Sequence, residues 1–298
     1  MQNSRKNTRA RSLGVRAAVI AGTAGVVLAM AAPMASAQDA EATGVPGAAV
    51  CEVGMEGCVS VVVNSGTFNN NGFNLPIGDG DMIIAGEILD AADGQSTVLI
   101  PRADGHNGLY AKALTVPGGV LGIDLPFNNL FGLAAVTAQV QAVDTPTFNG
   151  LFTDFDFNLP VRMKINNAFL GDNCFLGSEA APVNFHLAPA NVEFPSYEVL
   201  PDGGIKVSPI HNKATDFAIP AASGCGPFGV LNPIVNWRAK VPATSGTSLS
   251  TVSTGYMISG GTAGSDPLDD LGGGTGSSGS SGSSGSAGSL GSSGSSGS

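Results

Sequence analysis

The sequence predicts an all-β protein, with an antiparallel β-sandwich or barrel-like fold in a single disulfide-stapled domain. Apolar and polar residues alternate in many short runs between about residues 51 and 271, whereas helical periodicity does not recur there. Gly and Pro turn signals, such as Asn71-Gly72 and Asp202-Gly203, separate these runs. Four cysteines, an even number, lie in the same stretch. Many short strands with frequent turns are typical of antiparallel sandwiches and barrels.

The first 37 residues have the features of a secretory signal peptide. Five basic residues lie between positions 5 and 16, residues 17–30 are almost wholly apolar or small, and Ala35-Ser36-Ala37 forms a small-x-small cleavage pattern. We therefore expect a secreted protein, extracellular or associated with the cell envelope, that begins near Gln38. No later stretch approaches the roughly 18 uninterrupted apolar residues of a membrane span, so no membrane span is expected.

Composition divides the exported chain into three parts. Residues 38–50 lack periodicity and are expected to form a flexible leader. Residues 51–271 form the predicted β domain, whose length suits one all-β domain. Residues 272–298 are almost entirely Gly and Ser, so they have little apolar surface to bury and are expected to form a disordered tail.

The balance of charges argues against two classes of partner. The whole chain has 13 basic and 23 acidic residues. Five of the basic residues lie in the signal segment, so eight remain against 23 acidic ones, and the mature formal charge is −15. A chain this acidic offers no basic face to phosphates. Neither nucleic acid nor an anionic lipid surface is therefore an expected partner.

Nine runs of alternating or continuous apolar residues predict strands. They are residues 59–63, 82–89, 96–100, 136–143, 155–165, 181–188, 205–210, 234–241 and 250–258. The run 136–143 places its Val and Ala residues on one face and its Thr and Gln residues on the other. The run 155–165 places Phe, Leu, Val, Met and Ile opposite its charged and amide residues. Both patterns indicate strands that are buried on one face.

The four cysteines indicate two disulfide bonds. An exported chain enters an oxidising compartment, where an even number of cysteines can pair completely. Three pairings are formally possible. Cys51 and Cys58 are close enough in sequence to close a small loop before the first strand, which leaves Cys174 to pair with Cys225. No Cys-x-x-Cys spacing occurs and no His lies near any Cys. A metal site is therefore disfavoured, and no metal or cofactor is expected.

Three segments carry a resemblance to known proteins: LPVRMKINNAFLGDNCFLGSEAAPVNFHL (159–187), DFAIPAASGCGPFGVLNPIVN (216–236) and VPGGVLGIDLP (116–126). They resemble a functionally uncharacterised family of secreted actinobacterial proteins. The resemblance covers roughly residues 113–258 and is most specific over 159–183. It implies export and a Cys174–Cys225 bridge, but no chemistry. The sequence departs from the family pattern at Ala168, at Phe175 and in having the Cys51/Cys58 pair, so the N-terminal third is weakly covered.

No catalytic constellation stands out in the sequence, and no catalytic residue is assigned. The imidazole candidates are His106 in a predicted turn, His186 on the polar side of a predicted strand, and His211 just after another. No Gly-x-Ser-x-Gly nucleophile motif occurs in the predicted domain. Catalysis needs a nucleophile, a base and an oxyanion hole in one place. Solvated or hydrogen-bonded histidines are the preferred interpretation.

Pairs of carboxylates are the other candidates for chemistry. Asp79/Asp81, Asp90/Asp93 and Asp154/Asp156 could start a glycosidase pair or a calcium site. The calcium-loop pattern is absent, and Asp is common in turns, so turn formers and exposed strand residues are the preferred interpretation. One Trp and three Tyr also provide few aromatic platforms for sugars.

The pattern Phe-Asn-x-Leu-Phe occurs twice, at residues 127–131 and 148–152, each time beside a predicted strand. It gives a set of candidate interaction loops: Phe127, Leu130, Phe131, Phe148, Leu151 and Phe152. Burial at the ends of the β core is the preferred interpretation, because all fourteen Phe residues lie between 68 and 228. Exposed tips that meet a lipid or a partner are the alternative.

Two function classes follow from these observations, with an enzyme third. The preferred hypothesis is an exported, non-catalytic β protein that acts as a structural or interaction module in or outside the cell envelope. The alternative is an extracellular binding protein for an apolar ligand or lipid, which would need an apolar cavity. The third is a hydrolase with an unrecognised site, which would need Asp or His residues clustered in a cleft.

Overall fold

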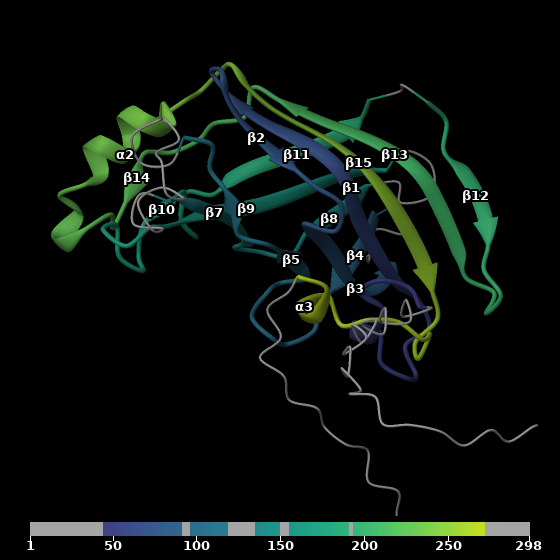
Figure 1. The fold of residues 1–298 in the computed structure, drawn as a ribbon. Coiled ribbons are helices and arrows are strands. Elements are labelled where there is room, and N and C mark those ends of the chain that lie inside the picture. The colour runs from purple at the N-terminus through teal and green to yellow at the C-terminus, as the bar shows by residue number, and fades with distance from the viewer. Residues whose placement is uncertain (1–43, 91–95, 119–134, 150–154, 191–192, 272–298) are drawn as a thin grey trace, which may run out of the picture. The chain divides into compact units, whose positions relative to one another are not determined.

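The strands of the computed structural model pair into one antiparallel network (Figure 1). The structure describes residues 44–90, 96–118, 135–149, 155–190 and 193–271. Its elements are η1 (Ala48–Val50), β1 (Cys58–Asn70), β2 (Phe73–Ile77), β3 (Met82–Asp90), β4 (Ser96–Ile100), β5 (Leu109–Ala111), β6 (Leu114–Thr115), β7 (Thr137–Ala142), β8 (Thr147–Asn149), β9 (Asp156–Asn166), β10 (Phe175–Leu176), β11 (Val183–Pro189), β12 (Ser196–Val199), β13 (Ile205–Thr215), β14 (Ala222–Ser223), η2 (Pro227–Gly229), α2 (Asn232–Ala239), β15 (Thr247–Ile258) and α3 (Pro267–Asp270).

The strand pairing closes into a ring. From β11 it passes through β13, β15, β1, β3, β4 and β8 to β9, and β9 pairs again with β11. The long strands β1, β13 and β15 run diagonally across β7, β9 and β11 (Figure 1). The predicted antiparallel all-β class is therefore confirmed.

One large apolar core fills the ring. In β9 the side chains alternate between buried and half-buried along the whole strand, as its sequence pattern predicts. The core joins strands that do not pair directly, because Phe68 of β1 lies 6.5 Å from Phe185 of β11 between ring centroids. Phe185 in turn meets Phe217 edge-on, with a centroid distance of 4.7 Å. These contacts bury the apolar faces that the alternation predicts.

The domain begins before the predicted boundary at Cys51. Val45, Ala48 and Val50 are buried, and η1 includes two of them. Val50 packs with Val62 and Ile83 on the outer face of β1 and β3, away from the main core. The prediction of a flexible leader is wrong for residues 44–50, because apolar side chains there cover a sheet face that would otherwise meet water. The predicted signal peptide (residues 1–37), residues 38–43 and the predicted tail (residues 272–298) lie outside the described residues.

Residues 232–239 form helix α2, so the predicted strand at 234–241 is wrong. Pro233 lies in the first helical turn, where a missing N–H breaks no helical hydrogen bond. Lys240 ends the helix in the left-handed conformation with a φ of 55°. Within α2 Val235 alone is buried, so the apparent alternation of this run does not mark a sheet face.

Candidate functional site

Both predicted disulfide bonds are present. Cys51 is bonded to Cys58 and Cys174 to Cys225, with Cα–Cα distances of 6.0 and 4.2 Å. No free cysteine lies among the described residues. The second bridge ties the segment before β10 to the segment that leads into α2. A backbone hydrogen bond of 2.7 Å from Gly226 N to Leu170 O supports the same junction.

Two asparagines on α2 fasten the helix to this junction. The Asn232 Oδ1 atom accepts a hydrogen bond from the Cys225 N–H at 2.9 Å, and the Asn236 Oδ1 atom accepts one from the Ala222 N–H at 2.7 Å. The two side chains are four residues apart and therefore lie on one face of the helix. They accept hydrogen bonds from backbone donors of Ala222 in β14 and of Cys225, two residues after the strand, and so fix α2 against this segment.

The other end of α2 is held by β1 and the turn that follows it. Asn70, which is 1% exposed, donates from Nδ2 to the Ala239 carbonyl at 2.7 Å and to the Lys240 carbonyl at 3.3 Å. These carbonyls are among the unpaired acceptors at a helix C-terminus. Lys240 Nζ also donates to the Asn71 carbonyl. Helix α2 therefore connects β1 to β14 and to the segment around Cys225.

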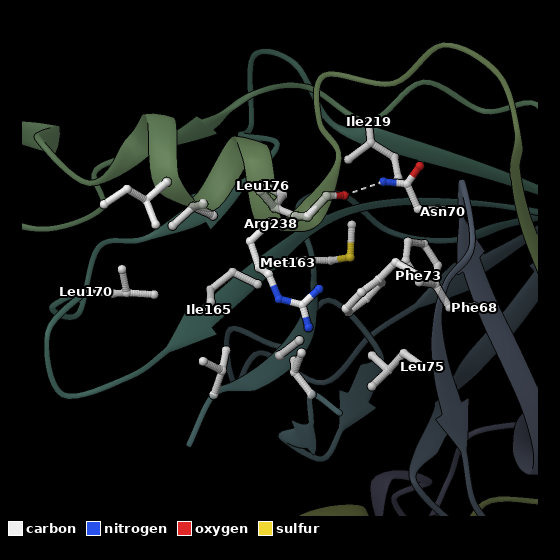
Figure 2. Close-up of a pocket in the computed structure, with 16 residues that line it drawn as sticks. Phe68, Asn70, Phe73, Leu75, Met163, Ile165, Leu170, Leu176, Ile219 and Arg238 are labelled. Carbon is white, nitrogen blue, oxygen red and sulfur yellow. Dashed lines mark hydrogen bonds between the residues drawn. The ribbon is translucent and has the colours of Figure 1, made fainter. Parts of the chain in front are cut away.

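An apolar pocket of about 90 Å³ lies under α2 (Figure 2). We call it the α2 pocket. Its described lining residues come from β1, β2, β7, β9, β10, α2 and the connections between strands: Phe68, Asn70, Phe73, Leu75, Val116, Val136, Ala138, Met163, Ile165, Leu170, Leu176, Ile219, Ile234, Val235, Arg238 and Ala239. Only Asn70 and Arg238 in this set have polar side chains. Since the Asn70 amide nitrogen already bonds the end of α2, Arg238 is the main polar feature of the pocket.

Arg238 reaches from α2 toward Met163, Ile165 and Phe73 (Figure 2). Its guanidinium carbon lies 5.7 Å from the centre of the Phe73 ring, a cation–π distance. Its Nη2 atom donates to the Pro117 carbonyl at 3.1 Å. The Nε atom is buried and has no hydrogen-bond partner among the described residues. The ion pairs between described residues do not include Arg238. The guanidinium is thus only partly satisfied.

Exposed apolar side chains surround the junction beside the pocket. Five of the described large apolar residues with high exposure belong to it: Phe169, Phe228, Val230, Ile234 and Trp237. Phe228 is fully exposed and has a φ of 57°, a conformation that bulky residues rarely adopt. A cluster of apolar side chains that are exposed to solvent is typical of a binding surface.

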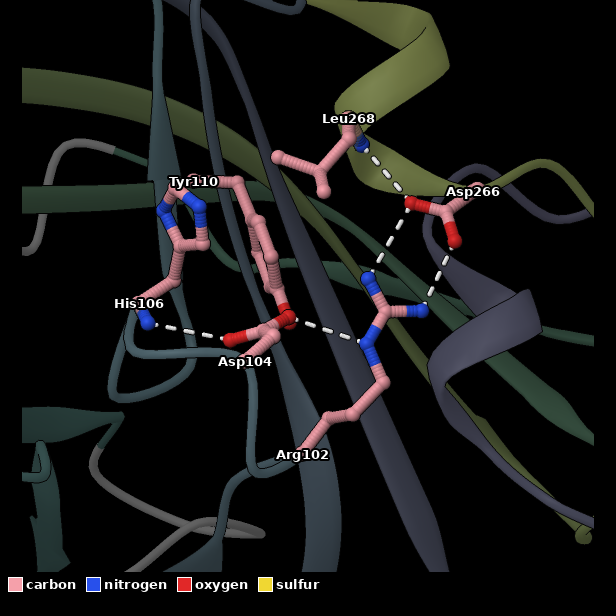
Figure 3. Close-up of polar contacts among 6 residues, drawn as sticks. All are labelled: Arg102, Asp104, His106, Tyr110, Asp266 and Leu268. Atoms are coloured by element: carbon pink, nitrogen blue, oxygen red, sulfur yellow. Dashed lines mark hydrogen bonds and ion pairs between the residues drawn. The ribbon is translucent and has the colours of Figure 1, made fainter. Parts of the chain in front are cut away.

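A second group of polar residues, which we call the α3 clamp, consists of Arg102, Asp104, Tyr110 and Asp266 (Figure 3). Arg102 bonds both oxygens of Asp266, at 2.7 and 3.3 Å, and Asp104 through Nε at 2.9 Å. The Tyr110 hydroxyl donates to Asp104 at 2.8 Å. Asp266 also caps α3 by accepting from the Leu268 N–H. Every charged group of the clamp therefore has an opposite partner.

These contacts shift the pKa values of the clamp. The hydrogen bond with Asp266 raises the pKa of Arg102, and the same bond lowers the pKa of Asp266. Burial would raise the pKa of Asp104, but hydrogen bonds from the His106 N–H, Tyr110 and Arg102 together lower it. Burial, and then the bond to Asp104, raises the pKa of Tyr110. All four groups favour the charge states in which the clamp forms.

The histidines considered as catalytic bases lie in separate places. His106 stacks on Tyr110 at 5.2 Å between ring centroids, beside the α3 clamp (Figure 3). His186 of β11 contacts Asp156 at 2.8 Å on the surface. His211 lies on β13. Among the described residues no group of three or more His, Cys, Asp or Glu side chains is placed to hold a metal ion.

The carboxylate pairs are also dispersed. Asp81 faces Lys112 at 3.6 Å, and Asp79 accepts a hydrogen bond from Asn64 at 3.1 Å. These are contacts of surface turns. Asp93 and Asp154 lie outside the described residues.

Of the six candidate residues in the repeated Phe-Asn-x-Leu-Phe segments, the structure describes Phe148. Phe148 is 2% exposed and packs against Phe157, with ring centroids 5.8 Å apart. The other five candidates, Phe127, Leu130, Phe131, Leu151 and Phe152, lie outside the described residues. The choice between core positions and exposed tips stays a prediction for them.

Arg238 was not singled out by its sequence, although one signal was available. It and Lys240 are the only charged residues between Asp216 and Asp266. An isolated pair of basic residues in a long uncharged stretch of an acidic protein marks a local change of charge. Sequence alone does not bring Arg238 beside Phe73 and Met163, because those residues belong to distant strands.

Comparison with known proteins assigns this chain to no family. No protein-family model matches the chain, and neither a curated protein nor a solved structure is significantly similar to it. The resemblance to secreted actinobacterial proteins stays a prediction. The described part of the chain contains no helix with the length and apolar character needed to cross a membrane.

Proposed function

We propose that this chain is an exported, non-catalytic β protein that binds an apolar ligand in the α2 pocket. The observation that carries the proposal is the lining of the pocket, in which fourteen of the sixteen residues are apolar. Binding sites for small molecules combine such a lining with very few polar groups that orient the ligand. Ile234 lines the pocket and is half exposed, so part of the lining meets solvent.

The size of the pocket limits what can bind. A volume of about 90 Å³ is well below the roughly 300 Å³ or more of sites that enclose a drug-sized ligand. It suits several methylene groups of a chain, with the rest of the ligand lying over the exposed apolar residues of the junction. This use of the surface also agrees with the hypothesis of an interaction module. The two disulfide bonds support export, since such bonds persist in oxidising compartments.

Filling the pocket tests the proposal. Ala138 of β7 lines it and is 7% exposed, so Ala138→Leu adds three carbon atoms to the cavity. Decanol, a neutral chain, is the probe, and calorimetry measures its dissociation constant. We expect at least about a tenfold loss of affinity, because the displaced methylene groups are each worth roughly 0.8 kcal/mol.

Ala49→Leu is the matched control, since Ala49 is exposed in η1 and does not line the pocket. It should leave decanol affinity unchanged. Wild-type protein that does not bind decanol at all would refute the proposal. Unchanged affinity in Ala138→Leu would place the binding site elsewhere.

A further inference from the structure

We propose that the α2 pocket takes a single-chain amphiphile with a carboxylate head group, a fatty acid being the simplest case, and that Arg238 receives the carboxylate. The inference rests on the proposed function and adds the chemical class of the ligand. It starts from Arg238, the one charged side chain among the described residues that line the pocket.

The hydrogen bonds of Arg238 leave room for an anion. A guanidinium has five N–H donors. Among the described residues, Arg238 uses Nη2 on the Pro117 carbonyl, and its buried Nε has no partner. Burial of an unmatched charged donor is costly, and the Phe73 ring offsets only part of that cost. A carboxylate that accepts from Nε–H and a neighbouring Nη–H would form the two parallel bonds that arginine favours with this group.

The surrounding charges point the same way. The whole chain has a formal charge of −10, so its net charge repels anions. The segment from residue 217 to residue 265, which contains α2, carries no acidic residue and two basic ones, Arg238 and Lys240. No described carboxylate is paired with Arg238. A negatively charged head group would therefore be attracted to Arg238 in the α2 pocket.

The apolar part of the ligand is limited to one slender chain. The cavity of about 90 Å³ accepts part of an unbranched chain, and its walls include Met163, Ile165 and Leu170. Two chains or a fused ring system would need more room. The polar Asn70 does not compete for the head group as a donor, because its Nδ2 atom bonds the Ala239 and Lys240 carbonyls.

A pair of probes that differ only in the head group tests the inference. Decanoate and decanol have the same chain length, and decanoate is ionised at pH 7.5. The single tryptophan, Trp237, precedes Arg238 on α2 and is 78% exposed, so its fluorescence is an internal reporter of binding. Calorimetry gives the dissociation constants independently. We expect wild-type protein to bind decanoate at least about tenfold more tightly than decanol, the gain of one charge-assisted contact.

Variants at Arg238 separate the contribution of its charge to binding from that of the apolar lining of the pocket. Arg238→Gln should weaken decanoate binding about tenfold and leave decanol binding within about twofold. Arg238→Lys keeps the charge without the planar fork and should fall between the two. Lys213→Gln, an exposed change of the same charge on β13, should alter neither affinity. Thermal unfolding of each variant confirms that it is folded.

The possible failures are distinguishable. If wild-type protein binds decanol as tightly as decanoate, or if Arg238→Gln leaves the preference for decanoate intact, the inference is wrong while the proposed function stands. If neither probe binds, the proposed function fails and the inference fails with it. Decyl phosphate serves as a further arm, because tighter binding of the phosphate than of decanoate would contradict the carboxylate assignment.

Discussion

Helices α2 and α3 are each held by contacts to residues far away in the sequence, but the arginines beside them have different surroundings. Arg102 of the α3 clamp faces two carboxylates at 2.7 and 2.9 Å, and both are bonded further. Arg238 of the α2 pocket faces an aromatic ring and one carbonyl. A fully paired charge network stabilises a junction, whereas a partly satisfied charge in an apolar pocket is available to a ligand.

The two regions also differ in their covalent links. The Cys174–Cys225 bridge near α2 spans 51 positions, and the Cys51–Cys58 bridge near η1 spans seven. Loop-closure entropy predicts that replacing the first pair by Ala lowers the free energy of unfolding by about 4 kcal/mol, and the second by about 2 kcal/mol. Urea denaturation of the two double variants measures both. Equal losses would show that the bridge near α2 has no special role in holding that region.

The clamp gives the next largest expected effect. Asp266→Asn should lower the free energy of unfolding by about 1 to 2 kcal/mol at neutral pH, since it weakens charge-assisted bonds to Arg102. Decanol binding should not change, because the clamp does not line the α2 pocket. Asp269→Asn, an exposed carboxylate on the same helix, is the control for charge alone. A similar loss in both variants would remove the specific role of the clamp.

The same carboxylates set the response to acid. The pKa values of Asp104 and Asp266 are lowered in the folded protein, so their contribution is present above the ordinary carboxyl pKa of about 4 and is lost as pH falls through the folded values. Wild-type stability should therefore fall below about pH 4, and Asp266→Asn should fall less steeply. Unfolding curves between neutral pH and pH 2 measure this slope. Parallel curves would contradict the assignment.

Local patterns predicted the parts of this fold that local chemistry determines. The alternation over 155–165 became β9, and the run 96–100 became β4 with the same bounds. The disulfide pairing followed from spacing and from the resemblance to secreted proteins. In these cases the residues that form the signal are the residues that form the structure.

The rest depends on contacts between residues far apart in sequence. Helix α2 was predicted as a strand because its stabilising bonds reach to Ala222 and to Asn70, which a short window does not include. The burial of Val45 and Val50 likewise depends on a distant partner face on β1. The α2 pocket combines residues from Phe68 to Ala239. A local sequence pattern does not predict which side chains from such distant positions contact one another.

Replacing each arginine by methionine tests the difference between the two regions most directly. Methionine keeps much of the packing and removes the charge. Arg102→Met should lower the free energy of unfolding by about 2 kcal/mol or more, because it leaves Asp104 and Asp266 without their partner. Arg238→Met should leave stability unchanged or raise it by up to about 1 kcal/mol, as expected when a binding residue is removed from an apolar site. Urea denaturation of both variants without ligand measures the two changes in the free energy of unfolding. If Arg238→Met loses as much stability as Arg102→Met, the distinction between the two regions is wrong.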